Sequence, residues 1–211
     1  MRQILFSLFI FLQLPTVSAQ NVAAFFIQMP DDYLPQLEEA WRKDLIDLYQ
    51  AGKVATLDNT MGGRSTLEKI TTDYLLLQST ERSTLEIKLL PLINETYLAC
   101  VIATVKAPVA DSRVEFFTLD WKPLATSDLY TPVNPEWFIK DDPDRNSEPF
   151  LEAISYLDMN LVHYQLSVDD QTLTARYTTP DYLNQENRDR LIPFLKESPK
   201  VYRWKSGRFV E

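Results

Sequence analysis

Four stretches between residues 74 and 119 carry the hydrophobic pattern of β-strands. They are rich in β-branched, aromatic and aliphatic residues, and turn-like segments at 80–83, 91–95 and 107–112 separate them. Because these connections are short, neighbouring strands are expected to pair in antiparallel fashion. The predicted strands cover residues 74–79, 84–90, 97–106 and 113–119.

Two of these predicted strands differ in how their faces are patterned. In 84–90, apolar positions 85, 87 and 89 alternate with Glu86 and Lys88, which predicts one buried face and one face in water. In 97–106 both faces are largely apolar, so this strand is predicted to be central and covered on both sides. Its Cys100, the single cysteine, is expected to be a buried small hydrophobic residue.

Helical spacing and further strand patterns flank this region. Apolar residues at 37, 41, 45 and 48 predict a helix within 35–52 that ends at Gly52. The apolar segment 22–29 predicts a first strand or a docking segment, and 59–64 predicts a loop. Later in the chain, helices are predicted at 150–157 and 181–197, strands at 161–168, 172–178 and 201–204, and a turn at 206–207.

The order of these elements predicts an α+β fold with a mostly antiparallel sheet and packed helices. We expect one unit over residues 20–211, with sub-units 20–124 and 150–211 joined by a Pro- and Asp-rich connection, 125–149. Short matches between 83–90 and 171–178, and between 112–117 and 199–204, leave a second interpretation open. In it, the two halves are pseudo-repeated sheet-plus-helix units.

Residues 1–19 have the features of a secretory signal peptide. Arg2 precedes an apolar run at 4–14, Pro15 ends the run, and Val17 and Ala19 place small residues before a cleavage site. The alternative is a transmembrane anchor, but the run is shorter than the roughly 20 residues that a span needs. No cysteine lies near the site, so we predict a periplasmic or extracellular protein that is not a lipoprotein and has no later transmembrane segment.

Composition excludes several functional classes. Thirty acidic against 21 basic residues give a formal charge of −9, which argues against nucleic-acid binding. One Cys and one His exclude an intrachain disulfide, a Cys-rich zinc site and any site that needs two imidazoles. With four glycines there is neither a GxGxxG motif nor a P-loop, and we expect no cofactor.

Aromatic residues are concentrated in the Pro-rich connection and in the segment just before it. Trp121, Tyr130, Trp137 and Phe138 are candidates for a ligand or partner surface, because exposed aromatic rings stack on sugars and anchor protein partners. The alternative is that these rings pack over the sheet as a satellite cluster.

An acidic loop follows these aromatic residues. Asp142, Asp144 and Asn146 occupy alternate positions, as oxygen ligands of calcium do. Ser147 stands where a calcium loop has Gly, and Ala153 where it has the bidentate Glu. The alternative is therefore a solvated loop in which Ser147 caps the next helix.

No catalytic residues are predicted. A general base needs an orienting carboxylate and a nucleophile, and the sequence places only Asp158 and Asp169 in the neighbourhood of His163. His163 is therefore interpreted as a half-exposed strand residue. Among thirty acidic residues, no spacing selects a pair for glycoside hydrolysis.

Three runs resemble an uncharacterised family of secreted proteins from Bacteroides-type bacteria, domain of unknown function 3256. They are DLIDLYQAGK at 44–53, the long run that begins STLEIKLLPLINETYLACVIATVK at 83–124, and VYRWKSGRFV at 201–210. The resemblance implies a periplasmic or extracellular location and supplies no catalytic residues.

These observations favour a non-enzymatic binding or protein-interaction module whose partner is an unidentified protein or glycan of the cell envelope. Two alternatives stay open: a hydrolase that uses dispersed Asp and Glu carboxylates, and a subunit of a cell-envelope complex. A deep acidic cleft with two carboxyl groups of raised pKa would favour the hydrolase.

Overall fold

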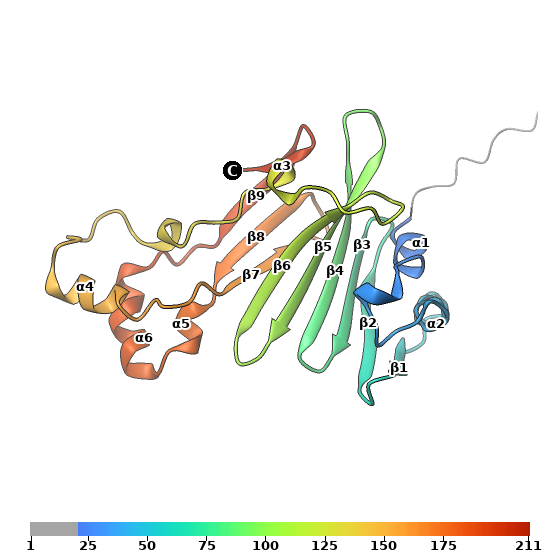
Figure 1. Ribbon diagram of the computed structural model, residues 1–211, viewed down its shortest axis with the longest axis horizontal. Helices are drawn as coiled ribbons and strands as arrows, with labels where there is room; N and C mark the ends of the chain where they lie inside the picture. Colours follow the sequence, from blue (N-terminus) through green and yellow to red (C-terminus); the bar gives the residue numbers. More distant parts are fainter. Residues whose placement is uncertain (1–20) are drawn as a thin grey trace, which may run out of the picture.

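The computed structural model of the protein describes residues 21–211, so the predicted signal peptide lies outside the described residues. Two antiparallel sheets, of six and four strands, are combined with helices, and the predicted α+β class is confirmed. Figure 1 shows the six-stranded sheet between α1 and α2 on one side and the four-stranded sheet on the other. Between residues 21 and 211, no helix has the length and apolarity needed to cross a membrane.

The first sheet is a meander in which each strand pairs with the next along the chain. The predicted strand 97–106 is confirmed with its bounds, and the other three predicted strands are each found within three residues. Two preceding strands at 56–70 were not predicted, because their apolar residues are few and polar residues interrupt them. The strands are β1 (Thr56–Asp58), β2 (Arg64–Ile70), β3 (Tyr74–Thr80), β4 (Ser83–Pro91), β5 (Tyr97–Lys106) and β6 (Ala110–Phe117).

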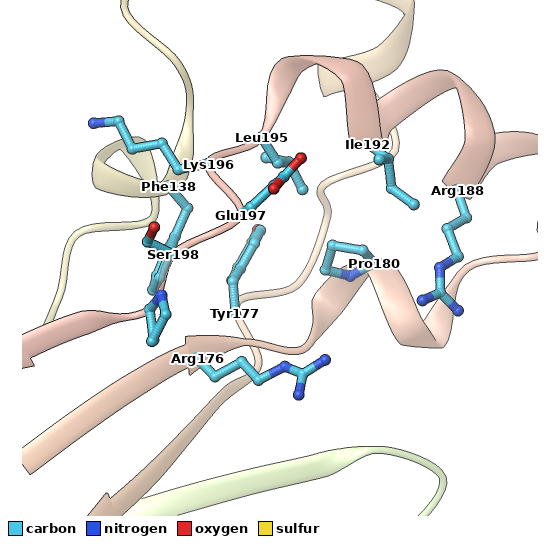
Figure 2. A pocket seen from close by; sticks show the side chains of 11 residues that line it. Phe138, Arg176, Tyr177, Pro180, Arg188, Ile192, Leu195, Lys196, Glu197 and Ser198 are labelled. Atoms are coloured by element: carbon cyan, nitrogen blue, oxygen red, sulfur yellow. The ribbon is translucent and has the colours of Figure 1, made fainter.

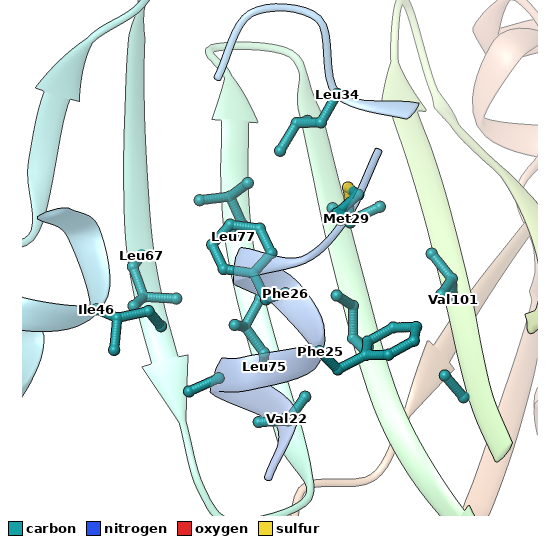
Figure 3. Close-up of a cluster of buried hydrophobic side chains, with 14 of the residues drawn as sticks. Val22, Phe25, Phe26, Met29, Leu34, Ile46, Leu67, Leu75, Leu77 and Val101 are labelled. Atoms are coloured by element: carbon teal, nitrogen blue, oxygen red, sulfur yellow. The ribbon is translucent and has the colours of Figure 1, made fainter. Parts of the chain in front are cut away.

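The N-terminal segment covers one face of this sheet as a helix, so of the two predictions for 22–29 the strand is wrong and the docking segment agrees with the structure. Helix α1 (Val22–Ile27) begins at Asn21, whose side chain accepts a hydrogen bond of 2.6 Å from the backbone N–H of Ala23. Figure 3 shows its apolar side chains, Phe25 and Phe26 among them, packed on residues of β3 and β5. A six-residue apolar run has no period that separates a helix from a strand.

The next helix, α2 (Glu39–Gln50), follows a short turn, η1 (Asp31–Tyr33), and begins later than predicted. Its Arg42 is only 1% exposed and had not been expected in the core. The guanidinium donates hydrogen bonds to the carbonyl groups of Ile27, Met29 and Leu37, which ties α2 to the preceding segment. Buried carbonyl groups need such donors, because water cannot reach them.

The second sheet follows the long connection and has the strand order β10-β9-β8-β7. The predicted turn at 206–207 joins β9 to β10, and both of its residues have positive φ, 51° for Ser206 and 83° for Gly207. The strands are β7 (Val162–Leu166), β8 (Thr172–Tyr177), β9 (Lys200–Lys205) and β10 (Arg208–Val210).

The edge strand β7 is attached to the first sheet through side chains rather than through a backbone ladder. The N–H of Val162 donates to Asp111 Oδ1 at 3.2 Å, and the N–H of Tyr164 donates to Ser112 Oγ at 3.1 Å. Both acceptors lie on β6. An edge strand otherwise leaves such N–H groups without partners, so these bonds join the two sheets and protect the edge.

The second sheet also covers Glu86 and Lys88 of β4, so the predicted water-exposed face of this strand is wrong. Glu86 is 4% exposed and Lys88 is 2% exposed. Glu86 Oε2 accepts a hydrogen bond of 2.9 Å from the N–H of Leu166. Lys88 Nζ donates to the carbonyl of Val168 at 3.0 Å and pairs with Asp73 at 2.9 Å. Both ionisable side chains are buried with partners that the alternating pattern did not reveal.

The remaining short elements lie in the connection and at the far end of the molecule. The predicted helix at 181–197 is divided into the end of α5, then α6 and the 3₁₀ turn η3. Pro193, which lacks an N–H, lies in η3. Figure 1 shows α4, α5 and α6 together at the end opposite α1 and α2. These elements are α3 (Thr126–Leu129), η2 (Pro135–Phe138), α4 (Glu148–Ile154), α5 (Thr179–Tyr182), α6 (Gln185–Leu191) and η3 (Ile192–Phe194).

Candidate functional site

A cavity of about 160 Å³ opens where the end of β8 meets α5, α6 and the segment leading into β9. Figure 2 shows the side chains that surround it. They come from Phe138, the end of β8, the helices α5, α6 and η3, and residues 195–199. Such meeting points between elements commonly hold small ligands.

Two backbone hydrogen bonds build one wall of this cavity. The N–H of Lys140 donates to the carbonyl of Phe194 at 2.9 Å, and the N–H of Lys196 donates to the carbonyl of Phe138 at 2.7 Å. The segments 138–140 and 194–196 therefore run beside each other as a short antiparallel bridge. This bridge positions Phe138 and Lys196 at the cavity although 58 residues (196 − 138) separate them in sequence.

Aromatic and aliphatic side chains form the apolar part of the lining. Phe138 and Tyr177 stack with ring centroids 4.9 Å apart and an interplanar angle of 7°. Figure 2 shows the ring of Tyr177 between Phe138 and Pro180. The Tyr177 hydroxyl is buried and has no hydrogen-bond partner among residues 21–211, and burial raises its pKa. A buried hydroxyl without a partner is uncommon in folded proteins.

The charged part of the lining is mainly basic. Arg176, Arg188 and Lys196 line the cavity together with one carboxylate, Glu197. Arg188 pairs with Asp181 at 2.8 Å, which holds its guanidinium next to α5. Within residues 21–211, Arg176 has no carboxylate oxygen within 4.0 Å. In Figure 2 the two arginine side chains extend toward each other, whereas Glu197 extends away from them.

The pKa of His163 is lowered by burial and by nearby positive charges, one of which is Arg176. His163 lies opposite Arg176 in the β7–β8 register and is partly buried. Burial lowers the pKa of His163, and the charges of Lys106 and Arg176 lower it further. In the described residues no Asp or Glu accepts a hydrogen bond from this imidazole, so the interpretation of His163 as a strand residue is retained.

The four predicted aromatic residues do not form one exposed surface. Trp121, Tyr130 and Phe138 are buried, because each packs into a hydrophobic core. Trp121 stacks on Phe25 with centroids 4.0 Å apart and donates to its carbonyl. Trp137 lies nearer the surface, beneath the ammonium group of Lys196 at 5.0 Å. Phe138 lines the cavity, and Trp137 lies beside it, so this pair keeps a connection to the candidate site.

The acidic loop has local hydrogen bonds of its own. Asp144 Oδ1 accepts from the N–H of Asn146 at 2.9 Å, and the Ser147 hydroxyl donates to the Asp144 carbonyl at 2.7 Å. Ser147 stands at the N-cap of α4, but its side chain makes no capping bond. In the described part of the chain, no group of three or more His, Cys, Asp or Glu side chains is placed to hold a metal ion. Calcium binding through Asp142, Asp144 and Asn146 stays a prediction.

Sequence reasoning did not identify Arg176 and Arg188. Arg176 occupies a polar position of an alternating strand, and Arg188 lies on a polar helix. Each is ordinary in its own segment, and only the packing of α6 beside the end of β8 brings them together. No local sequence signal therefore marks them as a pair.

Residues 14–209 match the family described as Protein of unknown function (DUF3256). The chain belongs to this family. The match covers nearly the whole chain, from within the predicted signal peptide to β10, and so includes every residue that lines the cavity.

A solved structure supports the DUF3256 assignment. It is described as the structure of a domain of an uncharacterized protein from Porphyromonas gingivalis W83, and it is 31% identical to this chain with a TM-score of 0.81. The likeness covers 90% of this chain and 98% of the other. No curated protein matches the chain.

Proposed function

We propose that this DUF3256 protein is exported and acts in the periplasm or outside the cell as a non-enzymatic binding module. The signal-peptide pattern at residues 1–19 supports export. The fold is compatible with cleavage after Ala19, because Asn21 caps α1 and Val22 is fully buried. Mass spectrometry of the protein from native cells should find a chain that begins at Gln20, and an uncleaved chain would contradict the signal peptide and favour the transmembrane anchor.

The observation that carries the binding role is the cavity beside Arg176 and Arg188. It combines an apolar wall with converging side chains that are positioned by backbone bonds and by the Asp181 ion pair. A preformed concave site of this kind binds a ligand without first paying the cost of ordering its lining.

The hydrolase alternative would need a carboxyl group of raised pKa within reach of a ligand. Glu86 is a carboxyl of this kind in residues 21–211, with a pKa raised to about 7 by burial. It lies between the sheets, bonded to Tyr74 and Leu166, and does not line the cavity. The binding role is therefore the better supported of the two.

The test is an NMR screen of residues 20–211 with small acids, amines and neutral molecules. We expect one chemical class or more to shift the amide signals of residues 176–199 saturably, and the ligand to be recovered unchanged after prolonged incubation. Ile192→Trp, at the rim of the cavity, should weaken binding. Leu151→Trp, at a similarly exposed aliphatic position on α4, should not.

Two results would contradict the proposal. If no molecule shifts these signals, the cavity is not a binding site. If ligands bind there and are converted, the hydrolase alternative is favoured.

A further inference from the structure

We propose that the cavity binds a small carboxylic acid whose apolar body is about the size of one six-membered ring. This inference rests on the proposed binding function and adds the chemical class of the ligand. It follows from three features of the lining: the arrangement of its charges, its apolar wall and its volume.

The arrangement of charges favours an anion. Arg176 and Arg188 come from β8 and α6, and their side chains extend toward each other at one side of the cavity (Figure 2). The chain as a whole carries nine excess negative charges, whereas the charged lining of this cavity is mainly basic. Without a bound anion, the two like charges repel each other, and Asp181 offsets only one of them.

Within residues 21–211, the acidic groups near the cavity do not pair with Arg176, so its guanidinium is available to a ligand. Asp181 is engaged by Arg188, and Asp141 lies 3.7 Å from Lys196. Glu197 lines the cavity but extends away from the arginines in Figure 2. The guanidinium of arginine is a planar fork that matches a carboxylate with two parallel hydrogen bonds. Arg176 is therefore the residue that we expect to contact the carboxylate, with Arg188 beside it.

The apolar part of the lining favours a ligand with an apolar body. Tyr177, Pro180, Ile192 and Leu195 line it. A bare phosphate or sulfate ion is hydrated on every side and would gain nothing from contact with these apolar side chains. The volume of about 160 Å³ is close to that of an engineered cavity of about 150 Å³ that holds benzene.

The experiment is an NMR titration of residues 20–211 at neutral pH and constant ionic strength. The probes are benzoate, benzyl alcohol, benzylamine and inorganic phosphate, each at millimolar concentrations. We expect benzoate to shift the amide signals of residues 176–199 saturably and with the highest affinity of the four. Phosphate should bind about ten-fold more weakly, because it does not use the apolar wall.

Matched variants test which arginine contacts the carboxylate of benzoate. Arg176→Gln should weaken benzoate binding about ten-fold, whereas Arg203→Gln should leave it unchanged. Arg203 is a matched control because it is an exposed arginine on the same outer face of the second sheet as Arg176, in the neighbouring strand β9. If Arg176→Gln perturbs the fold, Arg188→Gln provides a second test of the same prediction.

Failure of this inference is distinguishable from failure of the binding function. Binding of benzyl alcohol or benzylamine with an affinity equal to that of benzoate would contradict the proposal that the ligand is a carboxylic acid. The cavity would still be a binding site. Equal effects of the Arg176 and Arg203 variants would overturn the assigned contact and indicate general charge attraction. No saturable shift with any probe, in the wider screen as well, would overturn both proposals.

Discussion

Glu86 Oε2 on β4 accepts a hydrogen bond of 2.9 Å from the backbone N–H of Leu166 on β7, 80 residues later in the chain. The same oxygen accepts from the Tyr74 hydroxyl at 3.2 Å. A carboxyl group from one sheet thus provides the acceptor for an edge N–H of the other sheet. Because Glu86 is almost completely buried, the protonation state of this carboxyl is linked to the stability of the whole fold.

Glu86 should make the protein less stable as the pH rises from about 4.5 to about 7. Burial raises its pKa from 4.5 to about 7, against the opposing effects of Leu166, Tyr74 and Lys106. Between these values the folded state holds a proton that the unfolded state has lost, so raising the pH favours unfolding. The difference corresponds to about 3 kcal/mol in the free energy of unfolding.

The measurement is urea denaturation of the wild-type protein and Glu86→Gln at pH 5 and pH 8. An amide is neutral at both pH values and can still accept from the Leu166 N–H. We expect Glu86→Gln to be more stable than wild type at pH 8, by up to about 3 kcal/mol, with a smaller difference at pH 5. Glu68→Gln, at an exposed position of β2, is the control and should follow wild type. A loss of stability in Glu86→Gln that is equal at both pH values would contradict the linkage.

The acidic loop before α4 allows two interpretations that one set of thermal scans distinguishes. If Asp144 serves the turn through its bond to Asn146, Asp144→Ala should lower Tm by the equivalent of about 1 kcal/mol with or without calcium. If Asp142, Asp144 and Asn146 bind calcium, millimolar calcium should raise the Tm of wild type and not that of the Asp142→Ala/Asp144→Ala variant. An unchanged Tm of wild type in calcium would rule out the second interpretation.

The strands of the first sheet could be predicted because their signals are local. The alternation in β4, the doubly apolar pattern of β5 and the short turns between strands all lie within a few residues of each other. The buried position of Cys100 followed from the same pattern and is confirmed. The same local pattern misassigned Glu86 and Lys88, because a charged residue reads as solvent-exposed unless its distant partner is known.

The cavity could not be predicted for a related reason. Arg176, Arg188 and Phe138 belong to three segments, and only the bridge between 138–140 and 194–196 and the short helices after β8 bring them together. No periodicity encodes such a meeting. The predicted aromatic set contained Phe138 for its residue type, but exposure, which decides whether a ring can meet a ligand, depends on the tertiary packing.

Arg42 should contribute strongly to stability although Asp31, its ion-pair partner within residues 21–211, is mostly exposed. Its guanidinium satisfies the carbonyl groups of Ile27, Met29 and Leu37, whereas Asp31, at 2.8 Å, has a side chain that is 60% exposed. Arg42→Met would leave buried carbonyl groups without donors and should lower the free energy of unfolding by about 3 kcal/mol. Asp31→Asn should cost less than about 1 kcal/mol, because an exposed partner contributes little.

Urea denaturation at pH 7 measures these differences, with Lys43→Met as the control. Lys43 is the next residue of α2, is exposed and pairs with Asp47, so its replacement should change the free energy of unfolding by about 0.5 kcal/mol or less. Both Met variants remove one positive charge from the same helix, so the difference between them reports the buried hydrogen bonds. Equal effects of the two would show that the carbonyl groups held by Arg42 find other donors, and that α1 does not depend on Arg42 for its attachment to α2.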